Sequence, residues 1–474
     1  MYKLPLVPLQ ISYFTIDGQE QRTKGNNIMK TVAYHNLGCK VNSYEMDAML
    51  GTLRQKGYQI VPFEEKADIY IVNTCTVTNI ADRKSRQMLH KAKKTNPEGI
   101  VVAVGCYVQS DTQAVEADSA VDILIGNNRK KDLAAILENY LDGVKQESVI
   151  DINHTLEYEE MRLTSTEEHT RAYIKIQDGC NQFCTYCMIP YARGRVRSRS
   201  KAAVLEEIRG LAAAGYKEFV LTGIHISSYG IDFKEGENQR ENLLTLVQAI
   251  DTIEGVKRIR LGSLEPRIVT EAFAKSLSEL QHICPHFHLS LQSGCDTVLK
   301  RMNRHYTSEE YLKGVALLRE AFEHPAITTD VIAGFPGETQ QEFELTRQFV
   351  KTVQFYEMHI FKYSKRKGTK AAVMPDQIPE ETKAERSAAL QEIETKDSKD
   401  FRAFYIGKDV ETLLEEKKEI GGRTYWVGHT KEYVKTALEA LPGEDAAKGV
   451  LQNSLVTGRI TGFLEDEILL MELC

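Results

Sequence analysis

The chain has 474 residues, and at about 100 to 200 residues per domain this length predicts roughly three domains. Hydrophobic residues make up 42% and charged residues 27% of the chain, which excludes the disordered, collagen-like and coiled-coil classes. No run of about 18 apolar residues occurs, so we expect no membrane-spanning helix. The formal net charge of -7 neither indicates nor excludes a nucleic-acid partner, because a basic patch can be local.

Residues 1–28 precede the first strand pattern and read as irregular chain. We expect them to be a disordered extension, or Met29 to be the functional start. The apolar beginning is broken by Pro5 and Pro8 and has no small-residue cleavage site, so a secretory signal is not expected. The expected location is the cytoplasm.

Residues 29–142 alternate between strand and helix patterns, which predicts an open parallel α/β sheet. Cys39, Cys75 and Cys106 each follow the carboxyl end of an expected strand. Open α/β sheets place ligands at those ends, so the three thiols are expected to converge. Any single one of them could instead be a buried core residue. The expected strands span residues 31–37, 67–74, 100–105 and 122–126.

Residues 143–165 are polar and acidic and are expected to be a linker. A second alternating series covers residues 166–400 and ends in a long charged helix over 378–400. Six strand and helix units in about 200 residues predict an incomplete (β/α)6 barrel rather than a closed eightfold one. The six expected strands span residues 171–177, 218–223, 258–263, 286–292, 326–334 and 356–363.

Residues 401–474 contain five short strand patterns with Gly punctuation, which predict a small β-barrel of the kind that binds oligonucleotides. This segment has 9 Lys and Arg against 13 Asp and Glu. It therefore carries no electrostatic indication of RNA binding.

The cysteines carry most of the functional information. Nine cysteines in a chain of this length are too few for a disulfide scaffold. Cys180, Cys184 and Cys187 have CxxxCxxC spacing directly after the first expected barrel strand. Three thiolates on one loop can hold an iron-sulfur cluster and leave one iron without a protein ligand. A structural zinc site is the alternative, but no His lies between Tyr173 and Arg199 to close it.

This motif, with Tyr186 before its last cysteine, resembles the signature of the radical S-adenosylmethionine (SAM) superfamily. The CxxN motif from Cys39 to Asn42, two further single cysteines, the barrel and the small β-barrel together resemble the methylthiotransferases. Within that family, NLGCKVNSYE, NTCTVTNIADRKSRQ and KIQDGCNQFCTYCMIPYARGRVRS are similar to the branch that modifies N6-threonylcarbamoyladenosine at position 37 of tRNA.

The resemblance implies methylthiolation of carbon 2 of that adenine, with one SAM as methyl donor and a second as radical source. It also implies SAM and two 4Fe-4S clusters as cofactors, and an external one-electron donor of the flavodoxin or ferredoxin type. Cys180, Cys184 and Cys187 would hold the SAM cluster, and Cys39, Cys75 and Cys106 an auxiliary cluster that carries the sulfur. Cys284, Cys295 and Cys474 follow no ligand spacing and are expected to be ordinary thiols.

Further candidates for SAM binding lie near expected strand ends, where the family lines its cofactor pocket. Glycines at such places could equally serve turns, and the charged segment around Arg366 could be a solvated run. The candidates are Tyr186, Gly223, Glu265, Gln292, Asp330 and Arg366, with Gly334 and Gly337 beside them.

Two basic segments are expected to contact the phosphate backbone of tRNA. One is Arg193, Arg195, Arg197, Arg199 and Lys201; the other is Arg83, Lys84, Arg86, Lys91, Lys93 and Lys94. A solvated helix face is the alternative for the second. Three other functions remain open: a methylthiotransferase acting on isopentenyladenosine, one acting on a ribosomal-protein side chain, and a non-catalytic iron-sulfur electron carrier.

Overall fold

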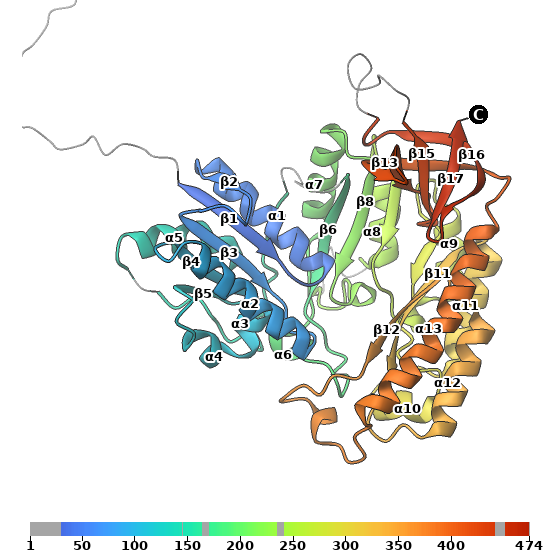
Figure 1. Ribbon diagram of the computed structural model, residues 1–474, viewed down its shortest axis with the longest axis horizontal. Helices are drawn as coiled ribbons and strands as arrows, with labels where there is room; N and C mark the ends of the chain where they lie inside the picture. The colour runs from blue at the N-terminus through green and yellow to red at the C-terminus, as the bar shows by residue number, and fades with distance from the viewer. Residues whose placement is uncertain (1–29, 145, 164–169, 235–240, 441–450, 474) are drawn as a thin grey trace, which may run out of the picture.

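The computed structural model describes residues 30–144, 146–163, 170–234, 241–440 and 451–473 (Figure 1). The expected extension over residues 1–28 and Cys474 lie outside these ranges. The chain forms an N-terminal sheet, a central open barrel and a C-terminal closed barrel, in that order. The predicted fold class is confirmed. Within the described residues, no helix combines the length and apolarity needed to cross a membrane.

The N-terminal domain is a five-stranded parallel sheet of order β2-β1-β3-β4-β5. Central strands β3 and β4 are buried almost throughout, as their continuous apolar sequences predict for a parallel sheet. Four strands were expected; the fifth, β2, has only three residues at the sheet edge, too few for a readable pattern. The strands are β1 Thr31–Asn36, β2 Gln59–Val61, β3 Ile69–Thr74, β4 Ile100–Gly105 and β5 Ile123–Ile125. The helices are α1 Lys40–Gln55, α2 Asn79–Thr95, α3 Cys106–Ser110, α4 Thr112–Glu116 and α5 Leu133–Leu141.

The central domain is a barrel of six parallel strands in two sheets, β6-β8-β9 and β10-β11-β12, bridged at Ile259–Ile283 and Leu264–Leu289. The expected strand over 286–292 ends at His288. The strands are β6 Arg171–Asp178, β8 Glu218–Gly223, β9 Arg258–Leu261, β10 His286–His288, β11 Ala326–Ala333 and β12 Glu357–Lys362, with β7 Arg197–Ser198 antiparallel to β6. The helices are α6 Ile189–Ala192, α7 Lys201–Ala213, α8 Leu243–Asp251, α9 Glu271–Ser278, α10 Asp296–Arg301, α11 Ser308–Ala321, α12 Gln340–Val353 and α13 Glu380–Ala403.

The segment expected to be a linker packs between the first two domains. Its described part has no helix or strand, yet Ile152, Met161 and Leu163 are buried. The Tyr44 hydroxyl of α1 donates to the Met161 carbonyl at 2.5 Å. This contact makes the segment part of the interface rather than a free connection.

The C-terminal domain is a closed barrel of order β13-β14-β15-β17-β16, which confirms the five predicted strands. Arg258 and Arg260 of β9 dock it onto the central barrel. Arg258 donates to the carbonyls of His429 and Glu411, both at 2.8 Å. Arg260 pairs with buried Glu218 at 2.7 Å and lowers the pKa of that carboxyl to about 2 against the effect of burial. The strands are β13 Asp409–Ile420, β14 Arg423–His429, β15 Lys435–Glu439, β16 Leu455–Glu465 and β17 Ile468–Leu473.

Replacing Arg258 with alanine is expected to loosen this docking. The variant loses both carbonyl bonds and one countercharge of Glu218, and breaking a buried ion pair costs about 3 to 5 kcal/mol. Limited proteolysis should cut faster between α13 and β13, and urea unfolding should show the loss. Arg423→Ala is the control, because this exposed arginine pairs with exposed Glu439 at 3.5 Å, a contact worth under about 1 kcal/mol. Equal proteolysis of the two variants would contradict the assignment.

Candidate active site: two cysteine triads

The N-terminal triad, Cys39, Cys75 and Cys106, lies at the carboxyl edge of the first sheet. Cys75 and Cys106 follow Thr74 and Gly105, which are register partners at the ends of β3 and β4. Cys39 caps the start of α1. Gly38 before it has φ +109°, and a Cβ there would lie 3.3 Å from the Cys75 sulfur. The three cysteines therefore share one edge, as predicted from the strand ends.

Asn42 of the CxxN motif ties the first two cysteine loops together. Its amide donates to the Leu37 carbonyl at 2.6 Å and to the Thr74 carbonyl at 3.1 Å. Leu37 precedes Cys39 and Thr74 precedes Cys75, so one side chain fixes the spacing of both.

The sulfur atoms of this triad differ in exposure and share an electrostatic environment. Cys39 is exposed, whereas Cys75 and Cys106 are buried. Burial, with smaller contributions from the nearby thiols of Cys106 and Cys39, raises the pKa of Cys75 to about 11. Cys106 accepts hydrogen bonds from Arg193 Nε at 3.2 Å and from Asn127 Nδ2 at 3.5 Å. A bound cationic centre would convert such thiols to thiolate ligands.

The second triad lies on the loop after β6. The Cys180 amide donates to the Gly194 carbonyl at 3.0 Å, so the loop folds back on the chain that leaves it. Gly179 has φ +71°, and a Cβ there would lie 1.8 Å from the Arg195 carbonyl oxygen. The glycine before Cys180 is therefore required by close backbone approach.

Each sulfur of the second triad accepts one hydrogen bond. Cys180 accepts from the Gln182 amide at 3.5 Å, Cys187 from the Ile189 amide at 3.4 Å, and Cys184 from Arg304 Nη1 at 3.4 Å. Burial, and then the other cysteines of the loop, raise the pKa of Cys180 to about 11 and that of Cys187 to about 12. The three thiols thus lie within electrostatic range of one another.

The spacing of both triads suits a cluster better than a single ion. In neither triad do all three sulfur atoms lie within 4.8 Å of one another. Thiolates around one tetrahedral zinc would be about 3.8 Å apart, from a Zn–S bond of about 2.3 Å. An iron-sulfur cube is larger and takes its ligands at separate irons. The residues present therefore fit two clusters.

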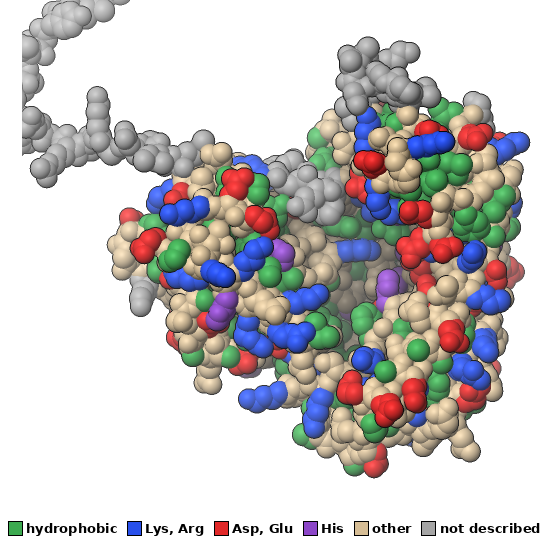
Figure 2. All heavy atoms as spheres, viewed as in Figure 1, with side chains coloured by type: hydrophobic (Ala, Val, Ile, Leu, Met, Phe, Trp, Pro, Cys, Tyr) green, Lys and Arg blue, Asp and Glu red, His purple; other side chains and the backbone are tan. Residues whose placement is uncertain are grey.

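A hollow lies between the N-terminal domain and the barrel (Figure 2). Cys39, the exposed member of the first triad, follows β1 of the N-terminal domain, and the second triad follows β6 of the barrel. Neighbouring protein atoms partly shield Lys40, the residue after Cys39, from water. This desolvation, with smaller contributions from Arg260 and Arg171 of the barrel, lowers the pKa of Lys40 to about 8. Arginines of the barrel therefore act electrostatically on the residue next to Cys39.

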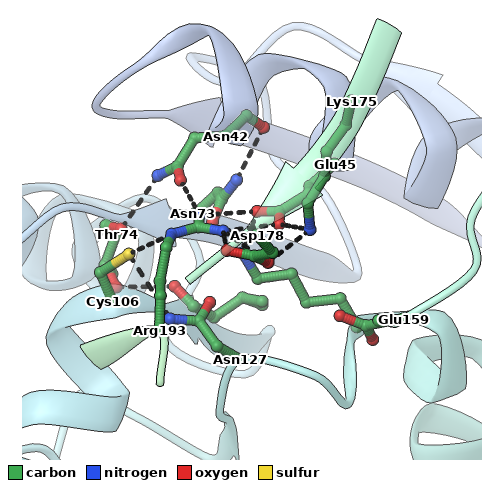
Figure 3. A network of polar contacts seen from close by, with 12 residues as sticks. Asn42, Glu45, Asn73, Thr74, Cys106, Asn127, Glu159, Lys175, Asp178 and Arg193 are labelled. Carbon is green, nitrogen blue, oxygen red and sulfur yellow. Dashed lines mark hydrogen bonds and ion pairs between the residues drawn. The ribbon is translucent and has the colours of Figure 1, made fainter. Parts of the chain in front are cut away.

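A buried polar network joins Cys106 of the first triad to the end of β6, the strand that precedes the second triad (Figure 3). Its centre is Arg193, which follows the second cysteine loop. The guanidinium contacts Glu45 at 2.9 Å, Asp178 at 3.1 Å and Asn42 Oδ1 at 2.6 Å, besides its bond to the Cys106 sulfur. Asp178 ends β6, two residues before Cys180. One arginine thus contacts the CxxN motif, a first-triad sulfur and the strand that carries the second triad.

Two lysines complete the charge balance of this network. Lys175 of β6 lies 2.6 Å from both Glu45 and Asp178, and Lys130 also pairs with Glu45. Although burial opposes it, Arg193 and the two lysines hold the pKa of Glu45 well below its usual value. Arg193 and Lys175 have the same effect on the pKa of Asp178. Both carboxylates therefore stay charged inside the protein.

The prediction that Arg193 to Arg199 contact RNA phosphates is wrong for three of its residues. Arg193, Arg197 and Arg199 are each 0% exposed. Arg199 pairs with Glu160 at 2.5 Å and with buried Glu207. Arg193 bridges the two domains, and Arg197 lies 3.8 Å from Asp178 within the barrel. All three side chains are enclosed by protein, so no phosphate can reach them.

The rest of that segment and helix α2 remain accessible to different degrees. Arg195 stacks over the Phe183 ring at 4.5 Å, and Lys201 pairs with Glu241 at 3.0 Å. Figure 2 shows Lys and Arg side chains gathered over α2 at the border of the hollow. Lys93 is half-buried and bonded to Asp122. The exposed basic residues of α2 are Arg83, Lys84, Arg86, Lys91 and Lys94.

Most of the expected SAM-binding residues lie at the carboxyl end of the barrel. Tyr186 packs edge-on against Phe335, with ring centroids 6.3 Å apart, in an apolar cluster that includes Tyr363. Gln292 has φ +66°, and its amide donates to the Asp330 carbonyl at 2.8 Å. β10 ends earlier, at His288, and beyond it the Leu291 amide donates to the Thr329 hydroxyl instead of to a backbone carbonyl of β11. The contacts of Tyr186 and Gln292 with SAM stay predictions.

Two other candidates have structural reasons of their own. Gly223 ends β8, where a Cβ would lie 2.9 Å from Ile226 and 3.0 Å from the Gln177 carbonyl, so close packing alone requires glycine. Glu265 is 8% exposed and accepts a hydrogen bond from Arg267 at 2.8 Å. Gly334 and Gly337 have φ of +73° and +72° and serve the turn after β11. Their roles toward SAM remain untested.

Arg366 connects the barrel to the N-terminal domain. Its guanidinium lies 2.6 Å from Asn79 and Asp82 and 2.8 Å from the Thr76 hydroxyl. Thr76 follows Cys75. Arg366 is therefore an interdomain contact beside the first triad, and its expected contact with SAM stays a prediction.

The residues that position the cysteines could not be identified from the sequence. The sequence contains one indication of such a residue: Lys175 is a charged residue inside the largely apolar strand pattern YIKIQD. Nothing in the sequence could pair it with Glu45, which is 130 residues away. The missed residues are Glu45, Asn127, Lys130, Lys175, Asp178 and Arg304.

Comparison with known proteins agrees with this geometry. The Radical SAM superfamily matches residues 174–350, and the Uncharacterized protein family UPF0004 matches residues 31–126. A Bacillus subtilis (strain 168) protein named threonylcarbamoyladenosine tRNA methylthiotransferase MtaB is 40% identical over 450 residues, which is 93% of this chain and 98% of that protein. The chain belongs to the radical SAM methylthiotransferase family. Members of this family use SAM and two 4Fe-4S clusters.

Other relatives span two branches of the methylthiotransferase family. A protein of the same name from Aquifex aeolicus (strain VF5) is 40% identical, covering 83% of this chain and 95% of its own. A Pelotomaculum thermopropionicum protein named tRNA-2-methylthio-N(6)-dimethylallyladenosine synthase is 34% identical, covering 81% and 86%. The radical SAM methyltransferase TsrM from Kitasatospora setae shares the fold, with a TM-score of 0.56 and 14% identity over 73% of this chain and 74% of its own.

Replacing Arg193 with methionine is expected to destabilise the protein by about 3 to 5 kcal/mol, because Glu45 and Asp178 lose their shared buried countercharge. Urea unfolding of anaerobically reconstituted protein measures this loss. Arg195→Ala is the matched control two residues away, since Arg195 stacks on one ring and pairs with no carboxylate in the network. Similar stability of the two variants would rule out the network as the main interdomain bond.

Proposed function

We propose that this protein methylthiolates carbon 2 of N6-threonylcarbamoyladenosine at position 37 of tRNA, in the cytoplasm. The supporting observation is that one buried network joins a sulfur of the first three-cysteine site to the end of the strand that carries the second, although the two sites lie in different domains (Figure 3). The relatives named for this reaction support the choice of substrate.

The six cysteines are proposed as the protein ligands of the two clusters. Cys180, Cys184 and Cys187 hold the SAM cluster, and Cys39, Cys75 and Cys106 the auxiliary one. Each set leaves one iron for a small-molecule ligand. When bound, the clusters and SAM supply the sulfur, the methyl group and the radical that insertion at an aromatic carbon requires.

The other residues position these sites and exclude water. Arg193, Asp178 and Asn42 fix the distance between the two cysteine loops. Holding reactive groups at a fixed short distance lowers the entropic part of the activation barrier. Tyr186, with its apolar neighbours at the carboxyl end of the barrel, keeps the SAM side dry. Exposed Cys39 marks the side from which substrate reaches the first triad. The electrons come from an external donor of the flavodoxin or ferredoxin type.

Two alternative substrates and one alternative class are less well supported. A relative named for dimethylallyladenosine is 34% identical over 81% of the chain, against 40% over 93% for the threonylcarbamoyladenosine relative. A ribosomal-protein substrate is supported only by the acidic C-terminal barrel. An electron carrier would normally saturate its irons with four cysteines, and each site here has three.

In a strain lacking this protein, threonylcarbamoyladenosine should accumulate in tRNA and its 2-methylthio derivative should be absent. Mass spectrometry of tRNA nucleosides and of ribosomal proteins measures both. The wild-type gene should restore the modification, whereas Cys39→Ala and Cys180→Ala should not. Each variant should keep about four of about eight irons, because each removes a ligand from one cluster. Loss of the dimethylallyl derivative or of a ribosomal-protein modification instead would overturn the proposed substrate.

The exposed face of α2 is proposed as a tRNA contact. Reversing two of its charges, with Arg83→Glu and Lys84→Glu together, should weaken tRNA binding and reduce the slope of log affinity against log salt by about 1 to 2. Filter binding at several salt concentrations measures this slope. The charge-matched control is Lys313→Glu with Lys396→Glu, on α11 and α13. A slope equal to that of the control would remove α2 from the RNA surface.

A further inference from the structure

A third group of metal-ligating side chains lies on the barrel strands, outside both cysteine triads. His288 of β10, Asp330 of β11 and His359 of β12 each offer one ligand atom, and these atoms all lie within 4.8 Å of one another. Among the described residues, no other three His, Cys, Asp or Glu side chains meet this spacing. The arrangement thus differs from both cysteine sites in ligand type and in spacing.

Strand register brings the three side chains to one face of the barrel sheet. His288 pairs with Thr328, and His359 pairs with Asp330 two residues further along β11. Residues two apart on a strand share a face. Thr329 between them points the other way, toward Tyr311 of α11, which covers the outside of the barrel. His288, Asp330 and His359 therefore face the barrel interior.

The hydrogen bonds of His288 leave a nitrogen aimed at the centre of this group. Its Nδ1 lies 3.0 Å from the Thr328 hydroxyl, and its Nε2 lies 3.3 Å from Asp330 Oδ2. Nε2 is buried and has no hydrogen-bond partner. Metal-ligating histidines usually donate their other ring N–H to a neighbouring acceptor. Thr328 occupies that position, and a cation between Nε2 and Asp330 would satisfy both lone pairs.

We propose that His288, Asp330 and His359 bind one divalent transition-metal ion. Two imidazoles and one carboxylate suit Mn(II), Fe(II) or Zn(II), whereas Ca²⁺ and Mg²⁺ prefer oxygen ligands. Ligand atoms at adjacent octahedral positions lie about 3 Å apart for bonds of about 2.1 Å. His359 is exposed on the edge strand β12, so it has room for the small movement that this requires.

The open positions of the ion would face the hollow. β12 is the edge of the barrel, and the chain after it reaches the N-terminal domain through Arg366. The threonylcarbamoyl group carries a carboxylate and a carbamoyl oxygen, which are suitable further ligands for such an ion. The idea that the ion selects the substrate by binding this group rests on the proposed function. Metal binding by the three residues is independent of the proposed function.

Titration of anaerobically reconstituted enzyme with Mn(II) tests the site. Bound Mn(II) is counted from the loss of the six-line EPR signal of the free ion, and Zn(II) is tested as a competitor. We expect one ion per chain, and His288→Gln, Asp330→Asn and His359→Gln should each weaken binding by about 10-fold or more. His154→Gln is the control, because His154 pairs with Asp151 at 2.6 Å on an exposed segment. Absence of binding by both ions, or binding unchanged in all three variants, would overturn the site.

A second arm tests the role of the site in substrate selection. N6-threonylcarbamoyladenosine should change the EPR spectrum of bound Mn(II), while adenosine and N6-dimethylallyladenosine should not. An unchanged spectrum overturns substrate coordination but leaves the metal site standing. Failure of the proposed function appears separately, in the nucleosides of the deletion strain.

Discussion

The buried network centred on Arg193 is the interaction on which the rest of the structure depends. Burying a charge costs free energy unless the charge has a partner. Removing one partner of a buried pair destabilises the folded state strongly, because the other charge is left buried and uncompensated. Here Glu45 and Asp178 share Arg193 and Lys175, so neither carboxylate tolerates separation of the N-terminal domain from the barrel. The domains are held in one geometry by charge balance as well as by apolar packing.

This constraint matters because the chemistry needs two reactive centres at one carbon. A displacement of about 1 Å between positioned groups can reduce a rate about 100-fold. Arg193 contacts the Cys106 sulfur, and Asp178 lies two residues before Cys180. The same bonds that hold the domains together therefore set the spacing of the cluster sites. Arg366, on the chain after β12, makes a second interdomain contact through Asp82 and Thr76, beside Cys75.

The sequence predicts the fold and the cysteines well, and their supporting residues poorly. The hydrophobic periodicity of a strand or helix depends on neighbouring residues only. The three domains and the positions of the cysteines after strands could therefore be predicted from the sequence. β2 and the end of β10 could not be predicted. β2 has only three residues, and beyond His288 a backbone amide bonds to the Thr329 side chain, which lies 38 residues away in the sequence from that amide. The prediction that Arg193 binds RNA was wrong because the local sequence around an arginine is the same whether its side chain lies in solvent or in the interior. Its actual partner, Glu45, lies 148 residues earlier in the chain.

Burial of the three arginines also restricts how RNA can approach. The C-terminal barrel has more acidic than basic residues, so it offers phosphates little attraction. Exposed cations lie on α2 and at Lys40, and also at Lys365 and Lys367, on the segment that contacts the start of α2. Burial thus divides the basic residues of the described chain into two groups. Arg193, Arg197 and Arg199 pair with carboxylates of the protein itself, whereas the exposed cations of α2 are open to an anionic partner. A cluster of arginines in the sequence therefore does not by itself mark an RNA surface, because the fold can use the same charges internally.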